Sequence, residues 1–225
     1  MAMMKSRLAS KGIRVAIVDD HPSVREGLRV LLHREGGFDV CGMAGTVSEA
    51  ITMIGEECPD VAIVDISLGK DNSLDLIRRL KAKHNTLRIL AWSMFDDLLY
   101  AERALAAGAM GYINKQEATQ KIFVAIRKVM DGEVYVSEKI ANHMMHRSVG
   151  GRPREDKSPI ESLSDRELEV FRMIGGGMTT AEISRALHIS VKTVETHRQR
   201  IKDKLQIEDA PKLVREATQW VLENG

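Results

Sequence analysis

Residues 14–20 read RVAIVDD, in which a run of apolar, mostly branched side chains ends in two aspartates. A strand buried on both faces of a sheet shows such an unbroken Val/Ile run rather than an alternation of polar and apolar residues. A second run of this kind, VAIVD at residues 61–65, also ends in an aspartate. The two runs therefore predict buried strands of a parallel sheet with acids at their carboxyl ends.

The segments around these runs alternate between short apolar stretches and longer stretches with helical spacing. Three more strands are expected at residues 39–43 (DVCGM), 88–92 (RILAW) and 111–113 (GYI). Helices are expected near residues 24–34, 48–56, 74–84, 98–107 and 119–130. Such alternation is typical of a parallel sheet covered by helices, so we expect an open α/β domain.

The composition is that of a globular protein with room for two domains, because the chain has 225 residues and a domain has roughly 100–150. Its hydrophobic fraction of 44% and charged fraction of 29% argue against wholesale disorder. No apolar run approaches the roughly 20 residues of a membrane helix, and the N-terminus lacks a signal-peptide core. We therefore expect a cytoplasmic protein without membrane contact. Cys41 and Cys58 lack metal-binding spacing and are expected to be packing residues.

The chain is expected to divide into a domain at residues 12–136, a linker at 137–160 and a second domain at 161–225. The linker carries Gly, Pro and mixed charges after a short helical stretch that runs through Met145. The second domain shows only helical patterns. Two capping boxes, Ser164 with Glu167 and Thr179 with Glu182, mark helix starts, and Ser190 is expected to cap a third helix.

Three acids follow predicted strands directly, namely Asp19, Asp20 and Asp65. A single acid at a strand end is usually a solvated loop residue, but ligands of open parallel sheets bind beyond these ends, so the set predicts one site. Crowded carboxylates repel one another unless a cation neutralises them, and Mg2+ prefers such oxygen ligands. An aspartate beside Mg2+ can attack a phosphoryl donor, with Lys115 as a second cation and Ser93 as a hydroxyl donor.

With these residues in place, residues 13–131 resemble a response-regulator receiver domain, which implies a flavodoxin-like (βα)5 fold. The resemblance implies a phosphoryl-acceptor role for Asp65 and a Mg2+ site. It assigns the other roles residue by residue: Mg2+ ligands Asp19, Asp20, Asp65 and the backbone carbonyl of Ser67; catalytic Lys115 and Ser93; switch residues Ser93 and Tyr112.

Three features depart from the family pattern. The loop at residues 68–73 reads LGKDNS, where relatives carry a Pro and then a Gly, so we expect a more flexible loop. Trp92 is unusually large beside the switch serine, and Phe95 stands where a polar residue is common. These changes leave the chemistry possible, while the lifetime of a phosphorylated state stays open.

Two helices joined by a tight turn, at residues 180–187 and 191–205, predict a helix-turn-helix. A small core is expected from Ile183, Leu187, Ile189, Val191, Val194 and Ile201. Residues 192–204 hold five basic side chains and two acids, so positive charge gathers on the second helix although the whole chain has a net charge of only +1. Lysine and arginine there would neutralise phosphates, and Lys192, Thr193 and Thr196 could reach base edges.

Residues 163–205 are similar to the LuxR-type helix-turn-helix, and the whole chain resembles the NarL/FixJ subfamily of response regulators. This similarity adds His197, Arg200 and Lys204 to the expected DNA contacts. It also implies that the helix at residues 211–223 forms a dimer through Leu213, Ala217 and Trp220, although this apolar stripe could instead complete the core.

We therefore expect a transcription regulator that is phosphorylated on Asp65 by a sensor histidine kinase. The phosphorylated protein is expected to form a homodimer and bind DNA. RNA polymerase is a further candidate partner. It is not expected to be an enzyme beyond its own phosphotransfer and autodephosphorylation. The alternative is a constitutive, phosphorylation-independent DNA-binding regulator. A nucleotide-using enzyme is disfavoured because the first strand runs into Asp19 and Asp20 without a glycine-rich phosphate loop.

Overall fold

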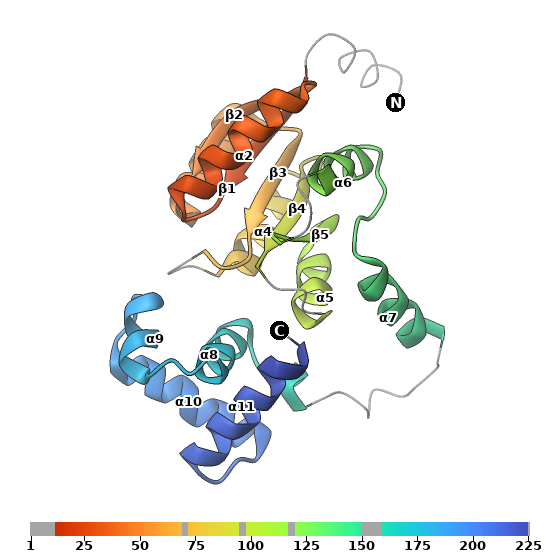
Figure 1. The fold of residues 1–225 in the computed structure, drawn as a ribbon. Coiled ribbons are helices and arrows are strands. Elements are labelled where there is room, and N and C mark those ends of the chain that lie inside the picture. Colours follow the sequence, from red (N-terminus) through yellow and green to blue (C-terminus); the bar gives the residue numbers. More distant parts are fainter. Residues whose placement is uncertain (1–11, 69–71, 95–97, 117–119, 150–158, 225) are drawn as a thin grey trace. The chain divides into compact units, whose positions relative to one another are not determined.

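The computed structural model describes residues 12–68, 72–94, 98–116, 120–149 and 159–224 (Figure 1). These fall into two compact units, one built mainly from residues before Ala141 and the other mainly from Ala141 onward. In the described part of the chain, no helix is both long and apolar enough to span a membrane.

The first unit contains a five-stranded parallel sheet with the strand order β2-β1-β3-β4-β5. Its strands are β1 (Ile13–Val18), β2 (Phe38–Ala44), β3 (Val61–Asp65), β4 (Arg88–Ser93) and β5 (Gly111–Asn114). The strands predicted from the two Val/Ile runs are β1 and β3, and they pair with each other at the centre. The expected flavodoxin-like α/β fold is confirmed.

Helices follow the strands as the sequence predicted. They are α2 (Pro22–Glu35), α3 (Val47–Glu57), α4 (Ser73–Lys83), α5 (Leu98–Ala107) and α6 (Gln120–Met130). Val15 and Ile17 of β1 share one apolar cluster with residues of α2 and α6. The intervening Ala16 and Val18 are buried as well. Successive strand residues point to opposite faces, so the sheet is covered on both sides.

Backbone hydrogen bonds continue past the ends of the strands and hold the loops that follow. The amide of Asp19 donates to the carbonyl of Ala44 over 3.1 Å, and the amide of Ile66 donates to Trp92 over 2.9 Å. The amide of Lys115 donates to the carbonyl of Ser93 over 2.6 Å. The residues after β1, β3 and β5 are therefore fixed at one edge of the sheet.

The chain returns to the free edge of β5 after α6. The amide of Tyr112 donates to the carbonyl of Tyr135 over 2.8 Å, and the amide of Tyr135 donates to Met110 over 3.0 Å. A Cβ on Gly111 would lie 2.9 Å from the carbonyl oxygen of Tyr135 and 2.7 Å from a methyl group of Leu90. Glycine at position 111 therefore permits this short parallel bridge, which sequence patterns did not predict.

Half of the expected linker is helical, because α7 (Glu138–Val149) extends past the short helix expected to run through Met145. Residues 150–158 lie outside the described residues. The two units divide within α7, between Ile140 and Ala141. The domain limits at residues 136 and 161 stay predictions.

Beyond α7, the described residues of the second unit form the 3-10 turn η2 (Pro159–Ser162) and four helices, which are α8 (Asp165–Gly175), α9 (Thr180–Ala186), α10 (Val191–Leu205) and α11 (Ala210–Asn224). Both predicted capping boxes form, at Ser164 and at Thr179, and Ser190 caps α10 by accepting from the amide of Thr193. The core includes Phe171, Ile174, Ile183, Leu187, Val194 and Ile201. Val191 does not belong to it, since 51% of its surface is exposed at the first residue of α10.

Candidate functional site

Three carboxylates meet at the carboxyl edge of the sheet, as the sequence predicted. Asp19 and Asp20 follow β1, and Asp65 is the last residue of β3. Together with His21, each of them offers one potential ligand atom, and these four atoms all lie within 4.8 Å of one another. Asp19 and Asp65 are buried, whereas Asp20 is partly exposed. The cluster therefore has two buried acids and one partly exposed acid.

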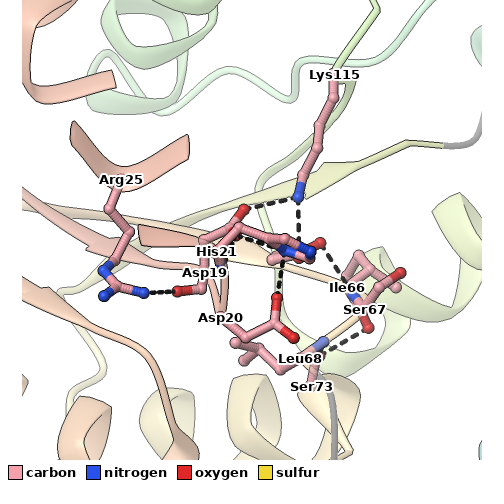
Figure 2. Close-up of polar contacts among 10 residues, drawn as sticks. Asp19, Asp20, His21, Arg25, Ile66, Ser67, Leu68, Ser73 and Lys115 are labelled. Carbon is pink, nitrogen blue, oxygen red and sulfur yellow. Dashed lines mark hydrogen bonds and ion pairs between the residues drawn. The ribbon is translucent and has the colours of Figure 1, made fainter. Parts of the chain in front are cut away.

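Lys115 brings a positive charge between the two buried acids. Its Nζ lies 2.6 Å from Oδ2 of Asp19 and 2.9 Å from Oδ2 of Asp65, and Figure 2 shows the side chain reaching across the end of the sheet to this point. Only 9% of the lysine side chain is exposed. Because buried charges need compensation, the lysine and the two acids depend on one another.

His21 was not among the expected site residues. Its Nδ1 lies 2.6 Å from Oδ1 of Asp20 and 3.4 Å from Oδ1 of Asp19. Its backbone amide donates to Oδ1 of Asp19 over 2.9 Å, and Arg25 donates to the backbone carbonyl of Asp19 over 2.5 Å (Figure 2). Its position directly after the acidic pair was the signal that could have identified it.

Asp65 is held in an environment that opposes its charge. Burial raises the pKa of its carboxyl, and the neighbouring Asp19 raises it further, while Lys115 and the amide of Ser67 lower it. The balance is a pKa above the ordinary value. The Ser67 amide donates to Oδ1 of Asp65 over 3.0 Å. A second cation at this edge would favour the ionised, nucleophilic form.

The predicted switch residues lie on the two strands that follow β3 in the sheet. Ser93 is the buried last residue of β4, and Tyr112 is buried in β5. Trp92 precedes Ser93, pairs in register with Asp65 and packs into the apolar core. The structure thus places Ser93 near the acidic edge.

Hydrogen bonds of Ser73 connect the two described ends of the loop that follows Asp65. Ser73 donates to the carbonyl of Ile66 over 2.7 Å and accepts from the amide of Leu68 over 3.3 Å (Figure 2). Residues 69–71 of this loop and Phe95 lie outside the described residues, so the flexibility expected for residues 68–73 stays a prediction. Ser73, which stands where relatives carry the glycine of this loop, therefore forms two hydrogen bonds within the loop.

A second candidate site is the outer surface of α10. Lys192, Thr193, Thr196 and Arg200 are all exposed, as expected for residues that would meet DNA. Thr193 shares a hydrogen bond of 2.8 Å with the hydroxyl of Ser190, and Thr196 donates to the carbonyl of Lys192 over 2.9 Å. Both threonine hydroxyls are thus engaged by the helix and its cap.

Two of the expected DNA contacts, Lys204 and His197, also contact or pack against other parts of their own domain. Nζ of Lys204 lies 2.6 Å from Oε2 of the buried Glu167 and donates to the carbonyl of Ser162 over 3.1 Å. His197 is half-buried, and burial, with Arg166 nearby, lowers the pKa of its imidazole. Lys204 therefore links α10 to α8, while 39% of its side chain remains exposed, and its contact with DNA stays a prediction.

Family models match both units. Residues 15–127 match the response regulator receiver domain, and residues 161–217 match the bacterial regulatory proteins of the luxR family. The chain belongs to the response regulators. It combines a receiver domain with a LuxR-type helix-turn-helix and is thus a two-component transcription regulator.

Named relatives align with this response regulator over most of their length. It is 34% identical to the oxygen regulatory protein NreC of Staphylococcus haemolyticus over 90% of this chain and 95% of the relative. It is 35% identical to the response regulator GacA of Pseudomonas viridiflava over 87% of this chain and 90% of the relative. A solved structure of RcsB from Salmonella enterica serovar Typhimurium, bound to promoter DNA with the phosphomimetic BeF3−, has a TM-score of 0.62 and 24% identity and covers 93% of this chain and 100% of that one. This structural likeness supports the fold.

Two of the three expected dimerisation residues of the response regulator belong to the core of its second unit. Leu213 and Ala217 are fully buried, and Trp220 packs against Phe171 with ring centroids 6.0 Å apart. Leu213 and Ala217 complete the core, which is one of the two readings that the sequence left open, while Trp220 is partly buried and its role in a dimer stays a prediction. On the outside of α11, Val214 and Leu222 are large apolar residues that remain exposed.

Proposed function

We propose that this response regulator accepts a phosphoryl group on Asp65 from a phosphohistidine of a sensor kinase and thereby controls its own binding to DNA. The observation that carries the proposal is the meeting of Asp65 with Asp19, Asp20 and Lys115 at one edge of the sheet. The transfer would form a P–O bond to Asp65 and break the P–N bond of the donor, with the imidazole as leaving group. Later attack by water would return the free carboxylate.

The donor set of this site suits Mg2+. Asp19, Asp20 and Asp65 offer hard carboxylate oxygens within 4.8 Å of one another, and the backbone carbonyl of Ser67 is the proposed further ligand. When bound, the ion would neutralise charge on the transferred phosphoryl oxygens. Three acids against one buried lysine leave an excess of negative charge, which supports a cation at this place.

The chain's own residues would handle the transferred group. Lys115 already contacts Asp65 and would pair with a phosphoryl oxygen as the carboxylate becomes esterified. Ser93 would donate its hydroxyl to another oxygen, and Tyr112 would re-pack as that serine moves. The phosphoryl group adds a charge of roughly −2, which is the force behind these movements.

The output we propose is binding of DNA by α10. Lys192 and Arg200 would neutralise phosphates, and Thr193 and Thr196 lie on the same exposed surface. RcsB, a structural neighbour, has been solved as two dimers bound to two parallel DNAs, which supports a homodimer as the active form here. A dimer contact through α11 would use its exposed Val214 and Leu222.

The remaining expectations follow from this role. The proposed limits of the receiver domain, the linker and the DNA-binding domain are residues 12–136, 137–160 and 161–225. The proposed place of action is the cytoplasm, with RNA polymerase as a downstream partner. Catalysis would be confined to the phosphotransfer and its reversal on Asp65.

The acceptor residue is tested by incubating the full chain with acetyl phosphate and Mg2+. Borohydride reduction then converts an aspartyl phosphate to homoserine, and peptide mass spectrometry locates it. We expect homoserine at position 65 in the wild type, none in Asp65→Asn, and none when EDTA replaces Mg2+. Label at another aspartate, or no label in a folded wild type, contradicts the assignment. DNA binding that stays the same with and without label would instead favour the constitutive regulator.

A further inference from the structure

An acidic residue stands on the exposed face of α10, among the basic residues that would meet DNA. Glu195 lies one turn after Val191, and 56% of its side chain is exposed. A carboxylate close to the phosphates of DNA weakens binding, because the phosphate backbone supplies most of the attraction to the protein. An acid on this face is therefore unfavourable unless it contacts something other than phosphate.

The side chain of Glu195 is held in place by residues of both helices of the motif. Its Oε1 accepts a hydrogen bond of 2.9 Å from the hydroxyl of Thr180, the first residue of α9. Its Oε2 lies 3.8 Å from Nε of Arg198, one turn further along α10. Each carboxylate oxygen can accept two hydrogen bonds, so these contacts orient the group and leave acceptor capacity free.

The chemistry of a carboxylate limits what it can bind in a major groove. An ionised carboxylate only accepts, and the donors on base edges there are the exocyclic amines of cytosine N4 and adenine N6. The adenine amine lies beside the acceptor N7, whose lone pair repels a carboxylate. Cytosine presents its amine without a neighbouring acceptor on the same base, so it is the better match for Glu195.

We propose that Glu195 is a specificity-determining residue that accepts a hydrogen bond from the N4 amine of a cytosine in the major groove, with Thr180 as its positioning residue. This inference rests on the proposed binding of DNA by α10. Glu195 lowers the overall affinity through repulsion of phosphates and raises the preference for one base pair. Thr193 and Thr196, whose hydroxyls already have partners in the helix and its cap, contribute less to that preference.

The test selects binding sites for the full chain from a randomised duplex library in the presence of acetyl phosphate and Mg2+. The variants are Glu195→Ala and Thr180→Val. The matched control is Asp203→Asn, which removes another exposed acid of the same helix, one that accepts from Gln199 over 2.7 Å. Circular dichroism verifies that each variant is folded.

For the wild type we expect a motif with a C·G pair in each half-site, and a C·G to T·A change should cost it about tenfold in affinity. In Glu195→Ala that change should cost nothing, while affinity for unrelated DNA rises. Thr180→Val should weaken the same preference, and Asp203→Asn should keep the wild-type motif. The same motif in Glu195→Ala and the wild type overturns the inference alone. A wild type that enriches no motif overturns the proposed DNA binding as well.

Discussion

At the scale of single residues, the acidic site depends on one lysine. Lys115 is the cation that two buried carboxylates, Asp19 and Asp65, share. Removing one partner of a buried ion pair is costly because the remaining charge stays buried without compensation. In the proposed phosphotransfer the same lysine would leave the carboxylate of Asp65 and pair with the phosphoryl group. Lys115 therefore stabilises the unphosphorylated fold through the contact that the proposed chemistry would replace.

We therefore expect Lys115→Met to lower the free energy of unfolding by about 3–5 kcal/mol in EDTA at pH 7. Mg2+ should restore part of this loss, since a metal ion would neutralise the same carboxylates. Urea denaturation with and without Mg2+ measures both effects. Adding Asp65→Asn to Lys115→Met should also recover stability, and a double variant as unstable as the single one contradicts the assignment.

The raised pKa of Asp65 predicts how stability changes with pH. The folded state binds the proton of this carboxyl more tightly than the unfolded state, so its contribution to stability falls as pH rises from the ordinary value of 3.8 through the raised one. Without Mg2+, Asp65→Asn should be more stable than the wild type at pH 7, and the difference should vanish as the pH falls below 3.8. Urea denaturation across this range in EDTA checks the sign. If Asp65→Asn is less stable than the wild type at pH 7, the attraction of Lys115 for the Asp65 carboxylate is larger than the cost of burying that charge.

At the scale of elements, sequence patterns located the strands and most helices because the central strands of this sheet are buried on both faces. They also located the helix starts, since Ser164 and Thr179 form local capping boxes. Sequence patterns did not decide which face of a helix is buried against the rest of its domain. Val191 has the right spacing for the core yet is exposed, whereas Leu213 is buried by packing within its own unit. Such outcomes depend on neighbours that are distant in sequence.

The ion pair between Lys204 and Glu167 gives a prediction that separates folding from DNA binding. Lys204→Met should destabilise the protein by about 1–3 kcal/mol, because it leaves the carboxylate of the buried Glu167 without its charged partner. The control Lys192→Met removes an exposed charge of the same helix and should change stability little while lowering DNA affinity. Thermal denaturation and DNA titration of both variants separate the effects. Equal stabilities would mean that Lys204 is free for DNA after all.

The bridge between β5 and Tyr135 gives a second prediction for an element. Gly111→Ala places a methyl group against Tyr135 and Leu90 and should cost about 1–3 kcal/mol. Hydrogen exchange at the amides of Tyr112 and Tyr135 should speed up, because these amides form the bridge. Gly55→Ala is the control: this glycine of α3 has open space where a Cβ would lie, so alanine there should stabilise by roughly 0.5–1 kcal/mol. Unchanged exchange in Gly111→Ala would show that the bridge tolerates the methyl group.

At the scale of the whole molecule, the candidate site was predictable wherever its residues end parallel strands. Asp19, Asp65 and Lys115 come from three different strand ends, and the common edge of the sheet brings them together. His21 and Ser73 were missed, since their contacts depend on how a loop turns and not on a strand's periodicity. The two family matches then place a receiver domain and a helix-turn-helix in one chain.

A small change in free energy is enough for phosphorylation of the receiver domain to alter the DNA-binding domain. If the phosphoryl group changes the free energy between inactive and active states by about 1.4 kcal/mol, their ratio changes tenfold. A few altered contacts around the proposed switch residues Ser93 and Tyr112 would therefore suffice.

The central claim is that phosphorylation of Asp65 sets the affinity of the protein for DNA. The most direct measurement is a titration of one duplex, chosen by selection with the wild type, against wild type and Asp65→Asn, each with and without acetyl phosphate and Mg2+. We predict that the phosphoryl donor raises the affinity of the wild type about tenfold and leaves Asp65→Asn unchanged. Equal affinities under all four conditions, with the wild type shown to be phosphorylated, would contradict this claim.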